Sequence, residues 1–204
     1  MVKRADLKRD RFYKRAKEEG YRSRSAFKLL QIEDKYDVLK EGDVVVDLGA
    51  APGGWSQVAK ELVGEKGVVI SVDLQHIKKL EGVESIKGDI TSEEETVSTI
   101  REKLFSERKD SVDVVLSDVS PKLSGNRDYD HFCSFELSKS ALNIASALLR
   151  KNGNFVVKIF QGAYYNKFYD GVKEKFRHTR AYSPEASRKR SAEVFVIGKE
   201  YYGE

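Results

Sequence analysis

The sequence has one cysteine, three histidines and no long apolar run. Cys133 is the only cysteine among 204 residues, which excludes a disulfide within the chain and is typical of a reducing compartment. The histidines, His76, His131 and His178, lack the spacing of metal ligands. No apolar stretch approaches the roughly 20 residues that cross a bilayer, and the N-terminus lacks the apolar core of a signal peptide. We therefore expect a cytoplasmic protein with neither a bound metal nor a membrane anchor.

Apolar residues are plentiful, and basic residues gather at one end of the chain. Apolar residues make up 40% of the sequence and are spread along it, so we expect residues 1–204 to fold as one domain. Residues 1–28 hold eleven Lys or Arg and four Asp or Glu, whereas the formal net charge of the whole chain is +4. The remainder is therefore slightly acidic. A basic arm on an acidic body favours a polyanion as partner, because each neutralised phosphate releases counterions.

Aromatic residues lie between these N-terminal charges. They are Phe12, Tyr13, Tyr21 and Phe27. Interleaved aromatic and basic side chains are typical of segments on which bases stack. The alternative is a solvated helix whose aromatic side chains pack on the body of the protein. We favour a nucleic acid as the partner and expect a binding arm or helix over residues 1–35.

Strand patterns and helix patterns alternate along the rest of the chain. Apolar runs predict seven strands, over 44–48, 68–73, 83–89, 112–118, 154–160, 176–182 and 193–198. Helices are predicted over 23–35, before the first strand, and over 54–63, 92–106, 134–150 and 164–174, between strands. This alternation predicts an α/β fold with a doubly wound, mostly parallel sheet. Because no helix separates the last two strands, we expect them to pair as a hairpin, with the final strand antiparallel.

A turn rich in glycine and alanine follows the first predicted strand. It reads DLGAAPGGW over 47–55, which is neither the dinucleotide fingerprint G-x-G-x-x-G nor a P-loop. Such a turn lets the backbone approach a ligand closely. Asp73 and Asp89 end the next two predicted strands, where one carboxylate would accept from ribose hydroxyls and the other from an adenine amino group. Each acid alone is more often a helix cap or turn former. Together they favour a nucleoside cofactor, and the glycine spacing disfavours the alternative of an NAD-dependent oxidoreductase.

One charged residue, Lys158, lies inside the apolar run FVVKIF. A buried strand does not hold a lysine without a partner or a task. The functional interpretation is that Lys158 belongs to an active site. The structural alternatives are a lysine on an edge strand or an ion pair with Asp118.

Seven blocks of the sequence follow one another in a specific order. They are YRSRSAFKL at 21–29, DLGAAPGGWSQVA at 47–59, SVDL at 71–74, GDI at 88–90, LSDVSP at 116–121, FVVKIFQG at 155–162 and ASRKRSAEVFVI at 186–197. In this order they resemble the FtsJ-type ribosomal RNA large-subunit methyltransferase E family, from Tyr21 onward. The resemblance implies a Rossmann-like class I methyltransferase fold with helices on both faces of the sheet. It also implies S-adenosyl-L-methionine as cofactor, bound through Gly53, Trp55, Asp73, Asp89 and Asp118.

The resemblance further implies a catalytic tetrad. Its members would be Lys28, Asp118, Lys158 and Glu193. Lys158 would accept the proton of a ribose 2′-hydroxyl and Lys28 would hold the ribose or its phosphate. A free lysine, with a pKa of about 10.4, is protonated near neutrality, so the competing charges around Lys158 decide whether it can act as a base. The sequence does not decide whether these charges raise or lower the pKa of Lys158.

Several expectations about the substrate follow from the resemblance. The substrate would be a uridine of large-subunit, 23S-type ribosomal RNA, as naked RNA or in the ribosomal subunit. Arg188, Lys189 and Arg190 would bind phosphate near Glu193 or form an exposed turn, and the polar segment 119–133 would be a loop that closes over the substrate. Transfer RNA is the alternative substrate, and a non-catalytic RNA-binding assembly factor is the alternative function. The family's common Met-Ala is Val119-Ser120 here, and SPEAS at 183–187 stands where a Lys-Pro pair is common, which puts substrate choice in doubt rather than the chemistry.

Overall fold

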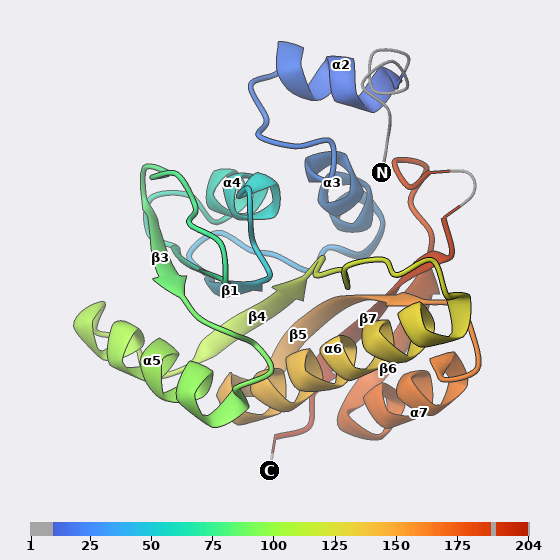
Figure 1. Cartoon of the computed structure of the whole chain (residues 1–204). Coiled ribbons are helices and arrows are strands. Elements are labelled where there is room, and N and C mark those ends of the chain that lie inside the picture. The colour runs from blue at the N-terminus through green and yellow to red at the C-terminus, as the bar shows by residue number, and fades with distance from the viewer. Residues whose placement is uncertain (1–9, 189–190, 204) are drawn as a thin grey trace.

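Seven strands form a single sheet with helices on both faces in a computed structural model that describes residues 10–188 and 191–203 (Figure 1). The strands are β1 Val44–Leu48, β2 Val68–Asp73, β3 Val83–Lys87, β4 Val112–Ser117, β5 Leu149–Phe160, β6 Phe176–Tyr182 and β7 Glu193–Tyr201. The helices in these ranges are α2 Arg11–Glu18, α3 Ala26–Tyr36, α4 Gly54–Val63, α5 Glu93–Ser106, α6 Arg127–Leu148 and α7 Tyr165–Lys175.

The strand order of the sheet is β3-β2-β1-β4-β5-β7-β6. β1 to β5 run parallel, and β7 is antiparallel to both β5 and β6. The predicted doubly wound sheet with an antiparallel final strand is therefore confirmed. The chain moves outward from β1 to β3 and then crosses to β4 on the other side of β1. Sheets of this kind bind ligands at the carboxyl ends of the strands beside such a reversal.

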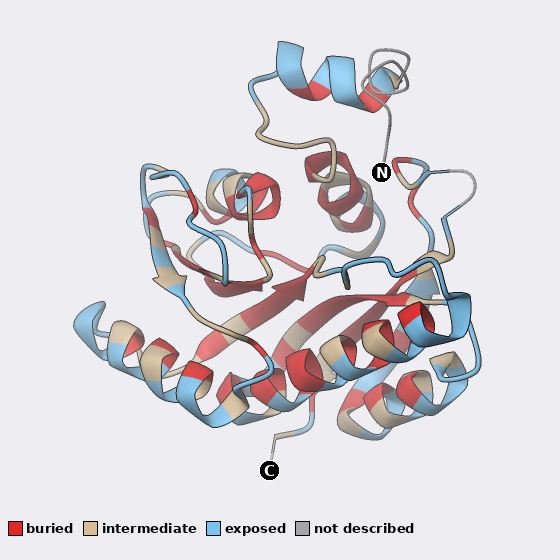
Figure 2. Cartoon of the chain, in the orientation of Figure 1, coloured by how far each residue is buried: buried red, intermediate tan, exposed pale blue. Residues whose placement is uncertain are grey.

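Two apolar cores lie on the two faces of the sheet. One lies between the sheet and α5, α6 and α7, and the other between the sheet and α3 and α4 (Figure 1). Successive strand residues point to opposite faces, so Val44 and Val46 enter the first core and Val45 the second. This two-sided burial explains the uninterrupted apolar runs, and the strands are buried along much of their length (Figure 2). None of the helices in the described ranges is long and apolar enough to span a membrane.

The largest departure from the predicted elements concerns α6. The helix begins at Arg127, seven residues before the predicted start, so the prediction of a loop over 119–133 is wrong for residues 127–133. The side chain of Asn126 caps the helix by accepting from the backbone N–H groups of Asp128 and Tyr129. An Asn before a helix was a readable signal, but the polar first turns have no apolar stripe. The helix ends at Leu148, and β5 starts at once with Leu149.

The N-terminal aromatic side chains divide into two groups. Phe12 and Phe27 are 7% and 3% exposed and pack with Ala16 and Ala186, so the expectation that they stack on bases is wrong. They instead attach α2 to α3 and to the segment before β7. Tyr13 is 38% exposed on the outer side of α2, which is largely solvated (Figure 2). The first nine residues of the basic arm lie outside the described residues.

Candidate active site

Lys158 and Asp118 meet at the carboxyl ends of two neighbouring parallel strands. Ser117 in β4 pairs with Val157 in β5, so the next residue of each strand lies alongside the other. Lys158 Nζ is 3.0 Å from Asp118 Oδ1 and donates to the Asp118 carbonyl oxygen at 2.7 Å. The lysine is 4% exposed. Because β5 lies between β4 and β7, the edge-strand reading of Lys158 is wrong, and the ion pair with Asp118 is present.

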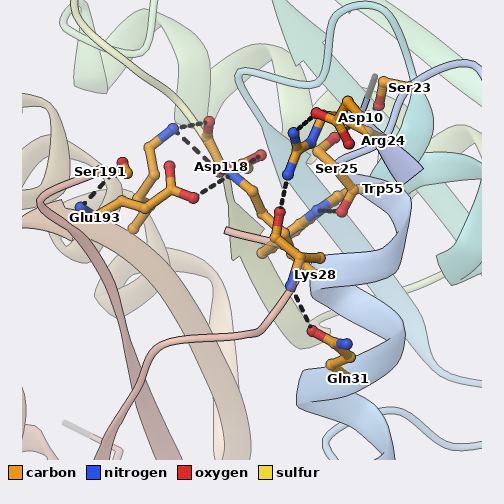
Figure 3. Close-up of polar contacts among 12 residues, drawn as sticks. Asp10, Ser23, Arg24, Ser25, Lys28, Gln31, Trp55, Asp118, Ser191 and Glu193 are labelled. Atoms are coloured by element: carbon orange, nitrogen blue, oxygen red, sulfur yellow. Dashed lines mark hydrogen bonds and ion pairs between the residues drawn. The ribbon is translucent and has the colours of Figure 1, made fainter. Parts of the chain in front are cut away.

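Lys28 and Glu193 complete a connected group of four charged side chains. Lys28 Nζ lies 2.9 Å from Glu193 Oε1 and 3.4 Å from Asp118 Oδ1 (Figure 3). Lys28 comes from the first turn of α3 and Glu193 opens β7, so a helix and three strands of the sheet meet here. The structure thus brings together all four residues of the predicted tetrad, as two ammonium groups and two carboxylates.

The two lysines control the ionisation of Asp118. Burial by itself raises the pKa of this carboxyl, but the charges of Lys158 and Lys28 and their hydrogen bonds outweigh burial and hold the pKa below its usual range. Asp118 is therefore a carboxylate at neutral pH. Its charge holds the Lys158 ammonium at the end of β5.

Two cavities lie near this charged group. One, of about 260 Å³, is lined by Lys28 and Glu193 together with Arg24, Leu123 and Arg188. The other, of about 240 Å³, lies over the ends of β1, β2 and β3. Both are lined by Ser120, two residues after Asp118. Because the two cavities share Ser120, the arrangement suits two ligands that approach each other near Asp118.

Carboxylates and apolar side chains line the second cavity. Asp73 and Asp89 both face it, with Ile90, Val119 and Leu137 as apolar walls. Asp73 accepts from the N–H groups of Ala51 and Gln75 at 2.9 and 2.7 Å. Asp89 Oδ1 accepts from the N–H and the hydroxyl of Thr91 at 2.9 and 2.7 Å. β3 ends at Lys87, so Asp89 lies two residues beyond the strand rather than at its last position.

The glycine-rich turn comes close to the segment after β4. Gly49 has φ +73°, and a Cβ there would lie 2.6 Å from Val119 Cβ, so only glycine allows this approach. Gly53, with φ +103°, precedes α4. The indole of Trp55 is 2% exposed, stacks on Phe195 and donates to the Ser25 carbonyl at 2.8 Å. The Trp55 side chain is therefore turned into the α3–α4 core, and its backbone at the start of α4 is the part that faces the turn.

Asp47 is a buried acid to which the sequence analysis gave no separate role. It is 1% exposed in β1 and accepts from Ser56 Oγ at 2.6 Å, and Ser71 Oγ donates to Ser56 Oγ at 2.7 Å. Burial, followed by the charges of Asp118 and Asp73, raises the pKa of Asp47 to about 7 against the opposing hydrogen bond from Ser56. The signal was an acid inside the apolar run VVVDL, the same kind of signal that pointed to Lys158.

Basic side chains surround the mouth of the first cavity. Arg188 is exposed there, while Lys189 and Arg190 lie outside the described residues. Arg24 also lines this cavity, forms an ion pair with Asp10 and donates to the Ala186 carbonyl (Figure 3). Of the three basic residues predicted at this mouth, the described part of the chain contains Arg188, and Arg24 adds a cation whose place here was not predicted.

This sheet order, with a glycine-rich turn and acids at the ends of β1 to β4, defines a Rossmann-like class I methyltransferase fold. The model of the family described as FtsJ-like methyltransferase matches residues 21–201, so the chain belongs to that family.

Relatives and solved structures agree with this assignment. A ribosomal RNA large subunit methyltransferase E of Methanosarcina acetivorans is 54% identical over 194 residues, 95% of this chain and 69% of that protein. The protein of the same name from Methanocaldococcus jannaschii is 50% identical over 198 residues, 96% of this chain and 80% of its own. A structure described as a ribosomal RNA methyltransferase of Plasmodium falciparum has a TM-score of 0.79 at 27% identity, covering 90% of this chain and all 100% of that one. Fibrillarin of Aeropyrum pernix with bound S-adenosyl-L-methionine shares the fold, with a TM-score of 0.55 at 17% identity over 87% of this chain and 75% of that one.

Proposed function

We propose that this chain transfers a methyl group from S-adenosyl-L-methionine to the ribose 2′-hydroxyl of a uridine in large-subunit, 23S-type ribosomal RNA. The observation that supports it most directly is the ion pair of the buried Lys158 with Asp118, beside two cavities that share Ser120. The names of the relatives, which specify large-subunit ribosomal RNA, favour this substrate over transfer RNA. The intact group of four charged side chains favours an enzyme over a non-catalytic assembly factor.

The cavity over β1, β2 and β3 fits the cofactor by its chemistry. Carboxylates suit ribose hydroxyls and an adenine amino group, and the apolar walls suit a flat base. Asp73, Asp89 and the backbone of the turn at Gly53 and Trp55 would hold the cofactor, with Asp118 next to its reactive end. When bound, S-adenosyl-L-methionine supplies a methyl group on a positively charged sulfur.

The cavity lined by Lys28 and Glu193 would receive the target ribose. Lys158 would take the proton of the 2′-hydroxyl as a neutral amine, after its ammonium has released a proton to solvent. Asp118, which is ionised and bonded to Lys158, would hold its amino group in place. Lys28, fixed between Asp118 and Glu193, would orient the ribose or the adjoining phosphate. The chain's own contribution is thus alignment and proton removal.

The surface around this cavity suits the rest of the RNA. Arg188 and the outer face of α2, with Lys14 and Lys17, would meet phosphates, and Lys189, Arg190 and the first nine residues would add to this charge. In this proposal residues 1–204 are one methyltransferase domain with a basic arm over 1–35. It acts in the cytoplasm.

The decisive experiment transfers labelled methyl from the cofactor to large ribosomal subunits or their RNA and maps 2′-O-methyl groups. We expect one methylated uridine with the native protein. The Lys158→Arg variant should lose at least about 10³-fold in turnover, because a guanidinium stays protonated and cannot accept a proton. RNA and cofactor affinities should stay within a few-fold, since a base acts mainly in the transition state.

Two results would contradict the proposal. Near-native transfer by Lys158→Arg would remove the proton-acceptor role and leave only a requirement for charge. Label on transfer RNA, or on a base rather than a ribose, would exclude the proposed substrate.

A further inference from the structure

Arg22, in the segment that joins α2 to α3, ties together two segments that are distant in sequence. Its guanidinium Nη1 donates to the carbonyl oxygens of Pro52 and Lys78 at 3.2 and 2.5 Å, and Nη2 donates to that of Lys79 at 2.7 Å. Pro52 belongs to the glycine-rich turn after β1, and Lys78 and Lys79 follow β2. One side chain therefore binds three backbone carbonyls on two loops.

The neighbours of Arg22 hold the same N-terminal segment along α4. Tyr21 donates its hydroxyl to Glu61 at 2.9 Å, and Gln57 accepts from the Arg22 N–H at 3.2 Å and donates to the Gly20 carbonyl at 3.1 Å. Glu61 and Gln57 both lie on α4. The segment that carries Arg22 is thus itself hydrogen-bonded to α4, the helix that follows the glycine-rich turn.

Glycine at position 53 is needed for this contact. Besides its φ of +103°, a Cβ there would come within 3.1 Å of Arg22 Nη1 and of Leu80 Cδ1. Ser23 lies even closer to the next residue, because a Cβ at Gly54 would be 2.2 Å from Ser23 Oγ. The two glycines give room for the N-terminal segment as well as for a ligand.

The two loops that Arg22 joins are continuous with walls of the cavity assigned to the cofactor. Gly49 lies on one wall, three residues before Pro52, and Asp73 and Leu74 lie on another, a few residues before Lys78. On the cavity side the loops are already joined by the bond from Ala51 N–H to Asp73. Arg22 is a second tie between the same loops that uses no atom of the cavity wall.

We propose that Arg22 is a positioning residue for the cofactor, one that sets the spacing of the two loops and makes the N-terminal segment part of the cofactor site. This inference rests on the proposed cofactor. A planar guanidinium can donate in three directions in one plane, whereas the single ammonium of lysine cannot reproduce that fork. Lysine at this position keeps the positive charge but cannot bind the three carbonyls on both loops.

The test compares Arg22→Lys and Arg22→Ala with the native protein and with Tyr21→Phe as matched control. Calorimetry measures S-adenosyl-L-methionine binding, and limited trypsin digestion with mass spectrometry measures cleavage after Lys78 and Lys79, whose carbonyls Arg22 holds. Arg22→Lys should bind the cofactor about tenfold more weakly and be cleaved at these two bonds several-fold faster. Its KM for the cofactor should rise by more than its kcat falls. Tyr21→Phe, which loses one bond from the same segment to α4, should match the native protein in both readouts.

Both changes in Arg22→Lys are required. Faster cleavage with native cofactor affinity would mean that the tie holds the loops without serving the cofactor, and weaker binding with native cleavage would mean that it does not hold the loops. Either result overturns the inference. Thermal unfolding of Arg22→Lys, expected within a few degrees of the native protein, separates this effect from a general loss of folding. If the native protein itself binds no S-adenosyl-L-methionine, the proposed function fails, whereas the cleavage rates still report on the tie.

Discussion

Asp47 is a buried acid and Asp118 is a partly buried one, with 15% of its side chain exposed. They lie at the ends of neighbouring parallel strands, and their pKa values shift in opposite directions. Burial raises the pKa of both. Around Asp118 the ammonium groups of Lys158 and Lys28 more than offset burial, whereas Asp47 has hydroxyl partners and the like charges of Asp118 and Asp73, and its pKa is about 7. The sign of the neighbouring charges therefore decides ionisation at this edge of the sheet, because burial is common to both acids.

The comparison also separates two tasks. Asp118 stays ionised and holds two lysines that come from α3 and β5. Asp47 instead binds Ser56 in the first turns of α4 and so joins that helix to β1 next to the glycine-rich turn. Asp118 therefore positions the two lysines of the site, whereas Asp47 fixes the backbone of α4 next to the glycine-rich turn.

The largest effect that tests this comparison is expected from Asp118→Asn. Removing the charge leaves two buried ammonium groups without their shared partner, which costs about 3–5 kcal/mol of unfolding free energy at pH 7, and methyl transfer should be lost. The folded pKa of Asp118 is lowered, so its contribution is present above the unfolded value near 3.9 and is lost as pH falls through the folded pKa. Urea unfolding at pH 7 and in the range below pH 4 measures this loss. A variant as stable as the native protein at pH 7 would show that Asp118 does not stabilise the two lysines.

An effect of opposite sign on stability is expected from Asp47→Asn. The folded pKa of about 7 lies above the unfolded value near 3.9, so the native protein loses stability as pH rises from about 4 to 7, while the unfolded state releases a proton that the folded state keeps. Asn cannot ionise and can still accept from Ser56. The variant should therefore be more stable than the native protein at pH 8, by about 4 kcal/mol, and similar at pH 4.

The control for this prediction is Asp110→Asn, an exposed acid whose removal should leave the pH profile of thermal unfolding unchanged. A second measurement combines the two acids. Because Asp118 is one of the like charges that raise the pKa of Asp47, the pH-dependent step should move to lower pH in Asp118→Asn. A step that stays in place would contradict the interaction between the two acids.

The smallest effect is expected at the surface, where charge is solvated. Lys14 and Lys17 are exposed on α2, so changing both to alanine should weaken RNA binding only a few-fold near 0.1 M salt. The slope of log K against log salt should fall by about 1.5, since two phosphate contacts are removed. Lys151 and Lys173, exposed on β5 and α7, are the control pair and should leave the slope unchanged. Equal slopes for both pairs would exclude α2 from the RNA-binding surface.

The sequence by itself determined the architecture and several site residues. Apolar runs and helical patterns are set by residues within a few positions of one another, and they predicted seven strands and their order of connection. Several site residues were predicted for the same reason, because each breaks or ends a local pattern. They are the glycine-rich turn, Asp73, Asp89 and the lysine inside FVVKIF. The start of α6 was missed because its first turns are polar and its signal is a single capping side chain.

Only the tertiary structure decided how the charges act. Lys28 and Glu193 come from opposite ends of the chain and meet at 2.9 Å, and no local pattern encodes that pairing. The opposite pKa shifts of Asp47 and Asp118, the inward turn of Trp55 and the bridge made by Arg22 depend in the same way on groups brought from different elements. Hydrophobic periodicity is a local property of the chain, whereas an electric field inside a protein is the sum over everything that folding places nearby.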